Sequence, residues 1–213
     1  MTESIVNNGR VMQALMAIPD EQRAAYADHA AALMGMAFQA QGATAFESTK
    51  RCAAIHEAGH CVVNTLVASP MMWPPTMTRI WREPIKGLTV WLGETRPAKN
   101  APRCAFDVRV DPYAYQAFAV SQLGGVVSEM LFDAADYRIG SSVDELVIAA
   151  GGAKSLAAVG LFETADSAFG ALLNITSQML ICNRDVVQAI AERLQASRRV
   201  QGAELTNLLA RIA

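Results

Sequence analysis

The sequence predicts a mainly α-helical fold with one small β element, and two observations support this. Apolar residues recur at helical spacing along most of the chain. Residues 76–83 ("TMTRIWRE") and 87–94 ("GLTVWLGE") instead alternate apolar with other residues and are rich in Thr, Ile, Val and Trp, as short strands are. The "EPIKG" segment between them is typical of a turn. At 213 residues the chain is long enough for one substantial core, or for one domain with a small appendage.

The N-terminal part of the chain is expected to form two helices, over residues 10–18 and 20–41. A Pro-Asp pair is the start signal for the second helix. The segment "QGATAFEST" then breaks the helical pattern. We therefore divide the chain into an N-terminal helical extension, residues 1–45, and a main domain, residues 46–213.

A long helix is predicted at the start of the main domain, over residues 46–67. Its inner stripe carries Ile55, Val62, Val63 and Leu66 at helical spacing. The segment "SPMMWPP" ends this helix, because proline cannot continue the hydrogen-bond ladder.

Further helices are predicted after the two strands and the loop "RPAKNAPR". Helical spacing returns over residues 111–132, and again from Val143 to the end in several pieces. Gly124 and Gly125 lie inside the first of these helices, where each glycine costs about 1 kcal/mol relative to alanine. That cost is tolerable where a neighbouring helix must approach closely.

The composition excludes several classes of protein. A net charge of −2 gives no basic surface, so a nucleic-acid partner is not expected. No apolar run reaches the roughly 18 to 20 residues that cross a bilayer, because "LVIAAGGAKSLAAVGLF" is interrupted by Lys154 and Ser155. We predict no transmembrane segment. The chain also opens without the pattern of an export signal, so a cytoplasmic protein is expected.

The four cysteines, Cys52, Cys61, Cys104 and Cys182, are widely spaced and form no C-x-x-C pair. This spacing argues against a zinc ribbon and against a disulfide framework, so we expect buried thiols. Cys52 and Cys61 flank the motif described next, and a metal-ligand role for one of them stays open.

The stretch "CAAIHEAGHCVV" places His56 and His60 four residues apart around Glu57, inside an otherwise apolar helix. Positions i and i+4 lie on the same helix face, so the two imidazoles can converge on one metal ion. Glu57 projects about 100° further round the helix, which suits it to hold a water molecule on the metal better than to bind the metal. This is the H-E-x-x-H pattern of zinc peptidases.

A catalytic zinc ion needs a third protein ligand and one open position. The only other histidine, His29, would require the N-terminal helix to fold over the motif, so a downstream carboxylate is favoured. Ser141 and Ser142 precede Asp144 and Glu145 in an S-x-x-[DE] arrangement, so helix capping is an alternative role for either acid. The candidate carboxylates are Glu129, Asp133, Asp136, Asp144 and Glu145.

Four blocks in order resemble the peptidase domain of the FtsH-type ATP-dependent zinc metalloproteases: "HEAGHCVV", "GLTVWL", "LGGVVSEMLF" and "GSSVDELVIAA". The resemblance covers about residues 50 to 213. It implies a helical metallopeptidase domain with a small β element beside the active-site helix. It also implies zinc binding by His56, His60 and Asp144, catalysis by Glu57, and support of the ligands by Glu129.

The chain also departs from the family pattern. Val126 replaces a basic residue after the Gly-Gly pair, Met130 replaces an acid after Glu129, and Cys61 replaces a small residue after the second histidine. The 213 residues contain no segment like the family's ATPase module. The string "AAGGAKSL" lacks the G-K-[ST] ending of a P-loop and does not follow a strand, so it is not a nucleotide site.

These features predict a zinc-dependent endopeptidase acting on extended or unfolded polypeptides. The substrate is expected to pair with the strand segment of Gly87, Leu88, Thr89, Val90 and Trp91. A separate ATPase or self-association is a further expected partner. Two alternatives stay open: an inactive metal-binding relic that acts as a binding or assembly module, and a purely structural pair of helix histidines bonded to nearby carboxylates.

Overall fold

A computed structural model describes residues 35, 39, 42, 47–68, 73–85, 88–99, 101, 107–138 and 142–212. The side chains of residues 85, 88 and 89 are outside this description. Apart from three isolated positions, the expected N-terminal extension of residues 1–45 is also outside it, together with its two helices and His29.

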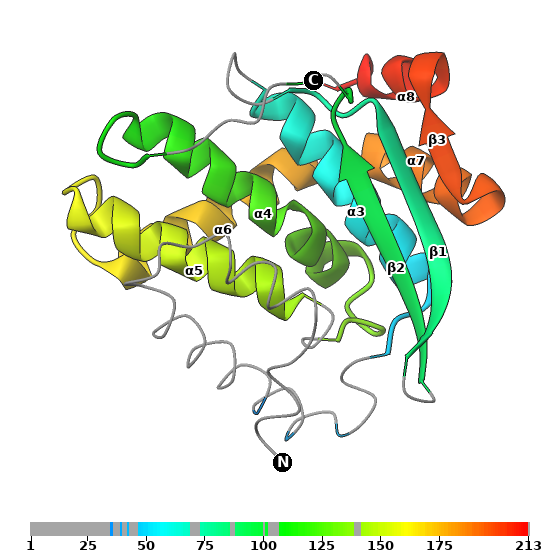
Figure 1. Cartoon of the computed structure of the whole chain (residues 1–213), viewed down its shortest axis with the longest axis horizontal. Helices are drawn as coiled ribbons and strands as arrows, with labels where there is room; N and C mark the ends of the chain where they lie inside the picture. The colour runs from blue at the N-terminus through cyan, green and yellow to red at the C-terminus, as the bar shows by residue number, and fades with distance from the viewer. Residues whose placement is uncertain are drawn as a thin grey trace.

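The described part of the chain is mainly helical with one small antiparallel sheet, which confirms the predicted fold class (Figure 1). None of its helices is long and apolar enough to cross a membrane. The elements are α3 (Lys50–Leu66), β1 (Met77–Ile85), β2 (Leu88–Arg96), α4 (Pro112–Phe132), α5 (Val143–Ala158), α6 (Ala165–Cys182), α7 (Arg184–Ser197), β3 (Arg199–Gln201) and α8 (Gly202–Leu209).

Helix α3 lies at the centre of the fold. Its N-cap is Thr49, whose hydroxyl oxygen accepts a hydrogen bond from the Cys52 N–H at 3.0 Å. Every residue from Cys52 to Val63 except His60 is buried, because α4, α6, α7 and the sheet all pack against this helix. Figure 1 shows α3 between α4 and the sheet. His56 and Glu57, within this buried stretch, are therefore shielded from bulk water.

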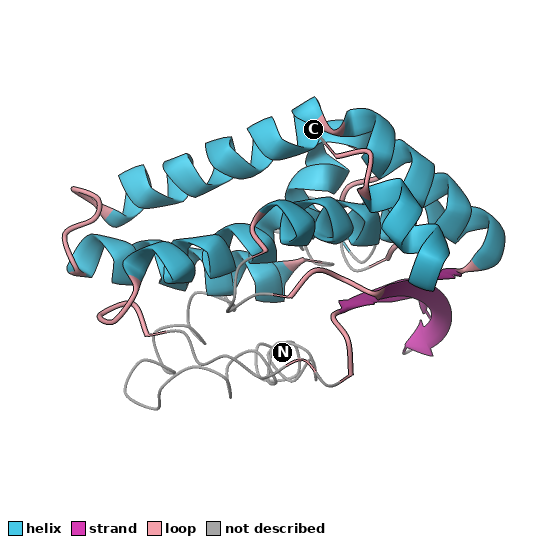
Figure 2. Ribbon diagram, turned by 90° about the horizontal axis from the view of Figure 1, so that it is seen from above, coloured by secondary structure: helices cyan, strands magenta, loops and turns pink. Residues whose placement is uncertain are grey.

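The sheet has the strand order β2-β1-β3, with all pairs antiparallel. Strand β1 pairs with β2 from Met77 opposite Arg96 to Ile85 opposite Leu88, so β2 is an edge strand. Figure 2 shows the sheet at one side of the helical part. Both predicted strands are confirmed, but β1 continues to Ile85, because Glu83, Pro84 and Ile85 of the segment expected as a turn still pair with β2.

Strand β3 is not in the sequence prediction. It follows α7 through Arg198, whose φ of 62° is left-handed and ends the helix. The carbonyl of Arg198 then accepts the Ile80 N–H at 2.9 Å. A three-residue strand carries too little alternation for a period-2 pattern to be recognised.

Helices α3 and α4 approach each other closely at Gly59 and Gly124. A Cβ on Gly59 would lie 2.2 Å from the carbonyl oxygen of Gly124, so no larger residue fits. Beside this contact the Ser128 hydroxyl donates to the Ile55 carbonyl at 2.9 Å. The helix contact expected from the Gly-Gly pair is confirmed, and it brings α4 against the histidine face of α3.

Candidate metal centre

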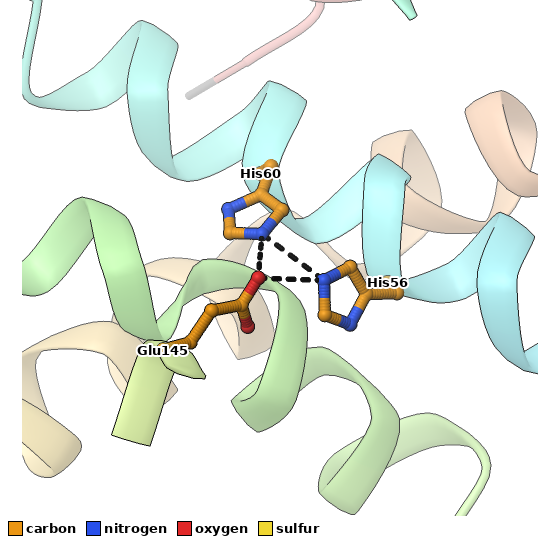
Figure 3. Close-up of side chains that lie close together, drawn as sticks. All are labelled: His56, His60 and Glu145. Carbon is orange, nitrogen blue, oxygen red and sulfur yellow. Dashed lines mark hydrogen bonds and ion pairs between the residues drawn. The ribbon is translucent and has the colours of Figure 1, made fainter. Parts of the chain in front are cut away.

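Three side chains from two helices converge on one point (Figure 3). The Nε2 atoms of His56 and His60, both on α3, lie 3.2 Å apart. The Oε1 atom of Glu145, on α5, lies 2.9 Å from each of these nitrogens. The i, i+4 spacing of the histidines therefore produces the expected convergence, and a carboxylate completes it.

The spacing of these three atoms suits a tetrahedral metal ion. Metal–ligand bonds of about 2.0–2.1 Å in a tetrahedron place the ligand atoms about 3.3 Å apart. The observed separations of 2.9 and 3.2 Å are within a few tenths of an ångström of that value. Two imidazoles and a carboxylate are also the donor set of a known class of catalytic zinc site.

The other nitrogen of each histidine is bonded in a way that leaves Nε2 available. The Nδ1 of His60 lies 3.1 Å from the carbonyl oxygen of Ser121, which can only accept, so Nδ1 carries the proton. The Nδ1 of His56 lies 2.5 Å from Oε1 of the buried Glu129, which accepts in the same way. These bonds fix the tautomer and the orientation of each ring, as outer partners do around zinc. Glu129 is thus placed where the sequence predicted a supporting acid.

Buried carboxylate charge dominates the electrostatics of the site. Burial opposes protonation of both rings, yet the Glu145 carboxylate beside them, joined at His56 by Glu129, raises the pKa of His56 and of His60 above the ordinary value. Burial by itself raises the pKa of the Glu145 carboxyl. The two imidazoles beside it nevertheless hold that pKa well below the usual range. A site that attracts protons so strongly also attracts a divalent cation in their place.

Two carboxylate oxygens at the site lack a hydrogen-bond donor among the described residues. They are Oε2 of Glu145 and Oε2 of Glu129, both buried. A buried oxygen without a donor is unfavourable by roughly 1–3 kcal/mol. A cation held by Glu145 would offset that loss, so the donor set fits a metal ion.

The carboxylate that the structure brings to the histidines is Glu145, and not Asp144, which the family resemblance implies. Adjacent helical residues differ in direction by about 100°, so only one of the two can face α3. Ser142 is the N-cap of α5 but makes no side-chain capping bond, and Glu145 bonds the histidines instead of closing a capping box. The sequence does not indicate which of two adjacent acids at a helix start faces the histidines, because this depends on how α5 packs.

Glu57 lies between the histidines and the sheet, and only 3% of its surface is exposed. Its Oε2 accepts a hydrogen bond from the Thr95 hydroxyl of β2 at 2.8 Å. Burial raises the pKa of Glu57, although the charges of His56 and His60 and the bond from Thr95 oppose this. The interaction with Thr95 carries no signal in the sequence.

Gly125 and Gly93 make room for the functional side chains. A Cβ on Gly125 of α4 would lie 2.3 Å from Nε2 of His56. A Cβ on Gly93 of β2 would lie 2.4 Å from Oε1 of Glu57. The sequence indicates close helix packing at the Gly-Gly pair of α4. The second glycine of this pair, Gly125, also leaves room for the His56 ring.

The predicted substrate strand is only partly described. Gly87 and the side chains of Leu88 and Thr89 lie outside the described residues. Val90 is buried. The Ser48 hydroxyl makes two hydrogen bonds to the main chain of Trp91. It donates to the Trp91 carbonyl at 2.6 Å and accepts from the Trp91 N–H at 2.7 Å. The chain's own Ser48 therefore occupies one position on the β2 edge.

The cysteines are not part of the cluster that the structure brings together. Cys52 and Cys61 are buried as expected, and burial raises the pKa of Cys61 to about 12. Cys182 is exposed, so the expectation of a buried thiol is wrong there, because the last turn of α6 faces solvent. Cys104 lies outside the described residues.

Comparison of the chain with models of protein families finds no match, and comparison with curated proteins finds no relative. The resemblance to the FtsH-type peptidase domain therefore stays a prediction from the sequence. A functional assignment must rest on the geometry of the site.

Proposed function

We propose that the protein is a zinc-dependent endopeptidase that hydrolyses extended or unfolded polypeptides. The observation that carries this proposal is the convergence of His56, His60 and Glu145, each within 3.2 Å of the other two at its ligand atom. The acid that follows the first histidine, Glu57, is buried beside this cluster. Two histidines, a carboxylate and a neighbouring glutamate are the components that zinc-assisted peptide hydrolysis requires.

Each residue has a distinct task in this mechanism. Zinc, when bound, supplies Lewis-acid polarisation and a water molecule of lowered pKa. Glu57 would accept a proton from the attacking water as general base and pass it to the leaving amine as general acid. Glu129 and the Ser121 carbonyl hold the two imidazoles in the tautomer that leaves Nε2 unprotonated.

An extended substrate is proposed to bind along β2, the edge strand next to Glu57. Pairing with a strand edge recognises an extended conformation more than a sequence. Substrate would have to displace Ser48 in order to reach the main chain of Trp91. A separate ATPase is one proposed partner, because it would supply unfolded chains. Self-association is the other. The cytoplasmic location expected from the sequence also stays a proposal.

The test is cleavage of a loosely folded protein by the purified chain. We expect cleavage that a chelator abolishes and that one equivalent of added zinc restores. Glu57→Gln is nearly isosteric, so it should bind zinc and fold normally yet lose turnover by orders of magnitude. Cleavage that survives the chelator, or full turnover in Glu57→Gln, would contradict the proposal.

A second candidate function is a metal-binding module without catalysis, acting in binding or assembly. The position of Ser48 on the β2 edge favours it, because the main chain of Trp91 is already bonded. Zinc bound at one equivalent without any cleavage of flexible chains would support this candidate over the peptidase.

A further inference from the structure

We infer that Thr95 is a positioning residue for Glu57, holding one carboxylate oxygen so that the other faces the reacting water. Thr95 lies on β2, 38 residues from Glu57 along the chain. Because the role of Glu57 as base belongs to the proposed function, this inference rests on that function. It adds a residue to the site that the H-E-x-x-H pattern does not contain.

The first observation is the bond itself. The Thr95 hydroxyl lies 2.8 Å from Oε2 of Glu57 and donates a hydrogen bond to it. Glu57 is 3% exposed, so bulk water does not replace that donor freely. A hydrogen bond to a buried carboxylate is charge-assisted and therefore directional. It fixes the rotation of the carboxylate about its terminal torsion, which is otherwise soft.

The second observation is that Thr95 is itself held in place. Thr78 on β1 stands directly opposite Thr95 in the strand register, and their hydroxyl oxygens are 3.0 Å apart. Thr78 is fully buried. A hydroxyl has one proton, so when Thr95 donates to the carboxylate, Thr78 donates to Thr95. The sulfur of Cys61, 3.7 Å away, packs against the same hydroxyl. Two strands and one helix thus define where the donor lies.

The third observation concerns the other oxygen of Glu57. Gly93, two residues before Thr95 on the same face of β2, leaves the space into which Oε1 fits. The two ends of the carboxylate therefore differ: Oε2 accepts the Thr95 hydroxyl, and Oε1 lies against Gly93. We infer that Oε1 is the oxygen that takes the proton from water.

This arrangement predicts a specific kinetic effect. Loss of the Thr95 hydroxyl leaves the metal ligands and the β2 edge unchanged, so zinc content and KM should stay the same. The general base would be misoriented, so kcat should fall about 10- to 100-fold, the range seen when a group that orients a functional residue is lost. A purely structural role for Thr95 would instead change thermal stability without separating kcat from KM.

The experiment compares Thr95→Val, which keeps the shape and removes the hydroxyl, with Thr95→Ser, which keeps the hydroxyl. Thr65→Val is the matched control, because the Thr65 hydroxyl on α3 donates only to the carbonyl of Cys61 in the bonds described. For each variant we would measure zinc content, kcat and KM on a loosely folded protein. The infrared carboxylate band of Glu57 would be isolated in the metal-free protein by difference from Glu57→Gln.

We expect Thr95→Val to shift the Glu57 band and to lower kcat, Thr95→Ser to restore most of both, and Thr65→Val to change neither. An unshifted band in Thr95→Val, or equal losses of kcat in Thr95→Val and Thr95→Ser, would overturn the role of Thr95 while the peptidase stands. A wild-type chain that binds zinc and cleaves nothing would instead overturn the proposed function, and the positioning role with it.

Discussion

The chemistry of the site depends on single protons on the rings of His56 and His60. Each Nδ1 proton is held by a partner on α4, the Glu129 carboxylate for His56 and the Ser121 carbonyl for His60. Each Nε2 then lies 2.9 Å from Oε1 of Glu145, where a proton or a metal ion can bridge the two atoms. Without a metal ion this geometry favours protons on the rings, because Glu145 raises the pKa of both.

Glu145, and not its neighbour Asp144, is predicted to be the third zinc ligand. Outer partners of zinc ligands are worth about 10–100-fold in affinity, so loss of a direct ligand in Glu145→Ala should cost more than about 100-fold. Asp144→Ala is the matched control, since it removes an acid one position away, and it should change affinity by less than about threefold. Competition with a chromophoric chelator measures both. A larger loss of zinc affinity in Asp144→Ala than in Glu145→Ala would contradict this prediction and would support Asp144 as the ligand, as the family resemblance implies.

Zinc affinity is predicted to weaken as the pH is lowered. Because the pKa of each ring is raised above 6.5, the ordinary value for histidine, the weakening should already be present at pH values above 6.5. Glu145 raises the pKa of both rings in the metal-free protein although burial opposes this, so zinc must displace protons over that range. For the same reason the metal-free fold gains stability from these rings below about pH 6.5 and loses it as the pH rises through the raised values. Titrations of zinc affinity at several pH values test this. A constant affinity between about pH 6.5 and 8 would contradict it.

At the scale of elements, the site is made by the packing of α4 against α3 and of α5 against α4. Gly59 and Gly124 allow the helix backbones to approach, and Gly125 leaves the space in which the His56 ring lies. The buried acid Glu129 can then reach His56 across the contact. Packing and ligand geometry are therefore controlled by the same small residues.

Gly125→Ala is predicted to lower zinc affinity more than about tenfold, because its Cβ would lie 2.3 Å from Nε2 of His56. Crowding of a packed core should also lower the free energy of unfolding by about 1–3 kcal/mol. Gly170→Ala on α6 is the control, since nothing lies within 4 Å of its added Cβ, and it should raise stability by up to about 1 kcal/mol. Zinc titration and chemical unfolding of both variants check this. Similar zinc affinity in the two would refute it.

The sequence predicts those elements whose pattern is long enough to be periodic. Helix α3 was expected over residues 46–67 and runs from Lys50 to Leu66, because Thr49 caps it. Helix α4 begins one residue after the predicted Asp111, which is its N-cap. Strand β3 is too short for any pattern.

The candidate site was predictable only where residues share one helix. His56 and His60 follow from their i, i+4 spacing, and the position of Glu57 from the motif. Glu145 and Thr95 reach the site through the packing of α5 against α4 and of β2 against α3, which no local pattern records. Tertiary contacts thus decide which carboxylate joins the histidines and which residue bonds Glu57.

At the scale of the whole molecule, helix α3, which carries the two histidines and Glu57, packs against the edge strand β2. The sheet lies against α3 on the side of Glu57, and the helices that carry Glu129 and Glu145 lie on another side of α3 (Figure 1). No nucleotide-binding motif occurs in the 213 residues. Peptide hydrolysis and mechanical unfolding are separate tasks, and the proposed function requires only the first.

Flexible polypeptides are predicted to be cut, and stably folded domains to be spared. Threading a folded domain requires work against about 5–15 kcal/mol of stability, which zinc and Glu57 do not supply. Digestion of a loosely folded and a tightly folded protein, each with and without ATP, measures the difference. ATP-stimulated cleavage of the folded protein by the pure chain would contradict this prediction.

The central claim is a zinc ion held by His56, His60 and Glu145, and anomalous diffraction from zinc-soaked crystals tests it most directly. Data collected on both sides of the zinc absorption edge locate the ion independently of any assumed ligand. We expect one strong peak per chain, at about 2.0–2.2 Å from Nε2 of each histidine and from a carboxylate oxygen of Glu145. A peak bonded by Asp144 in place of Glu145, or no peak between the two histidines, would contradict it.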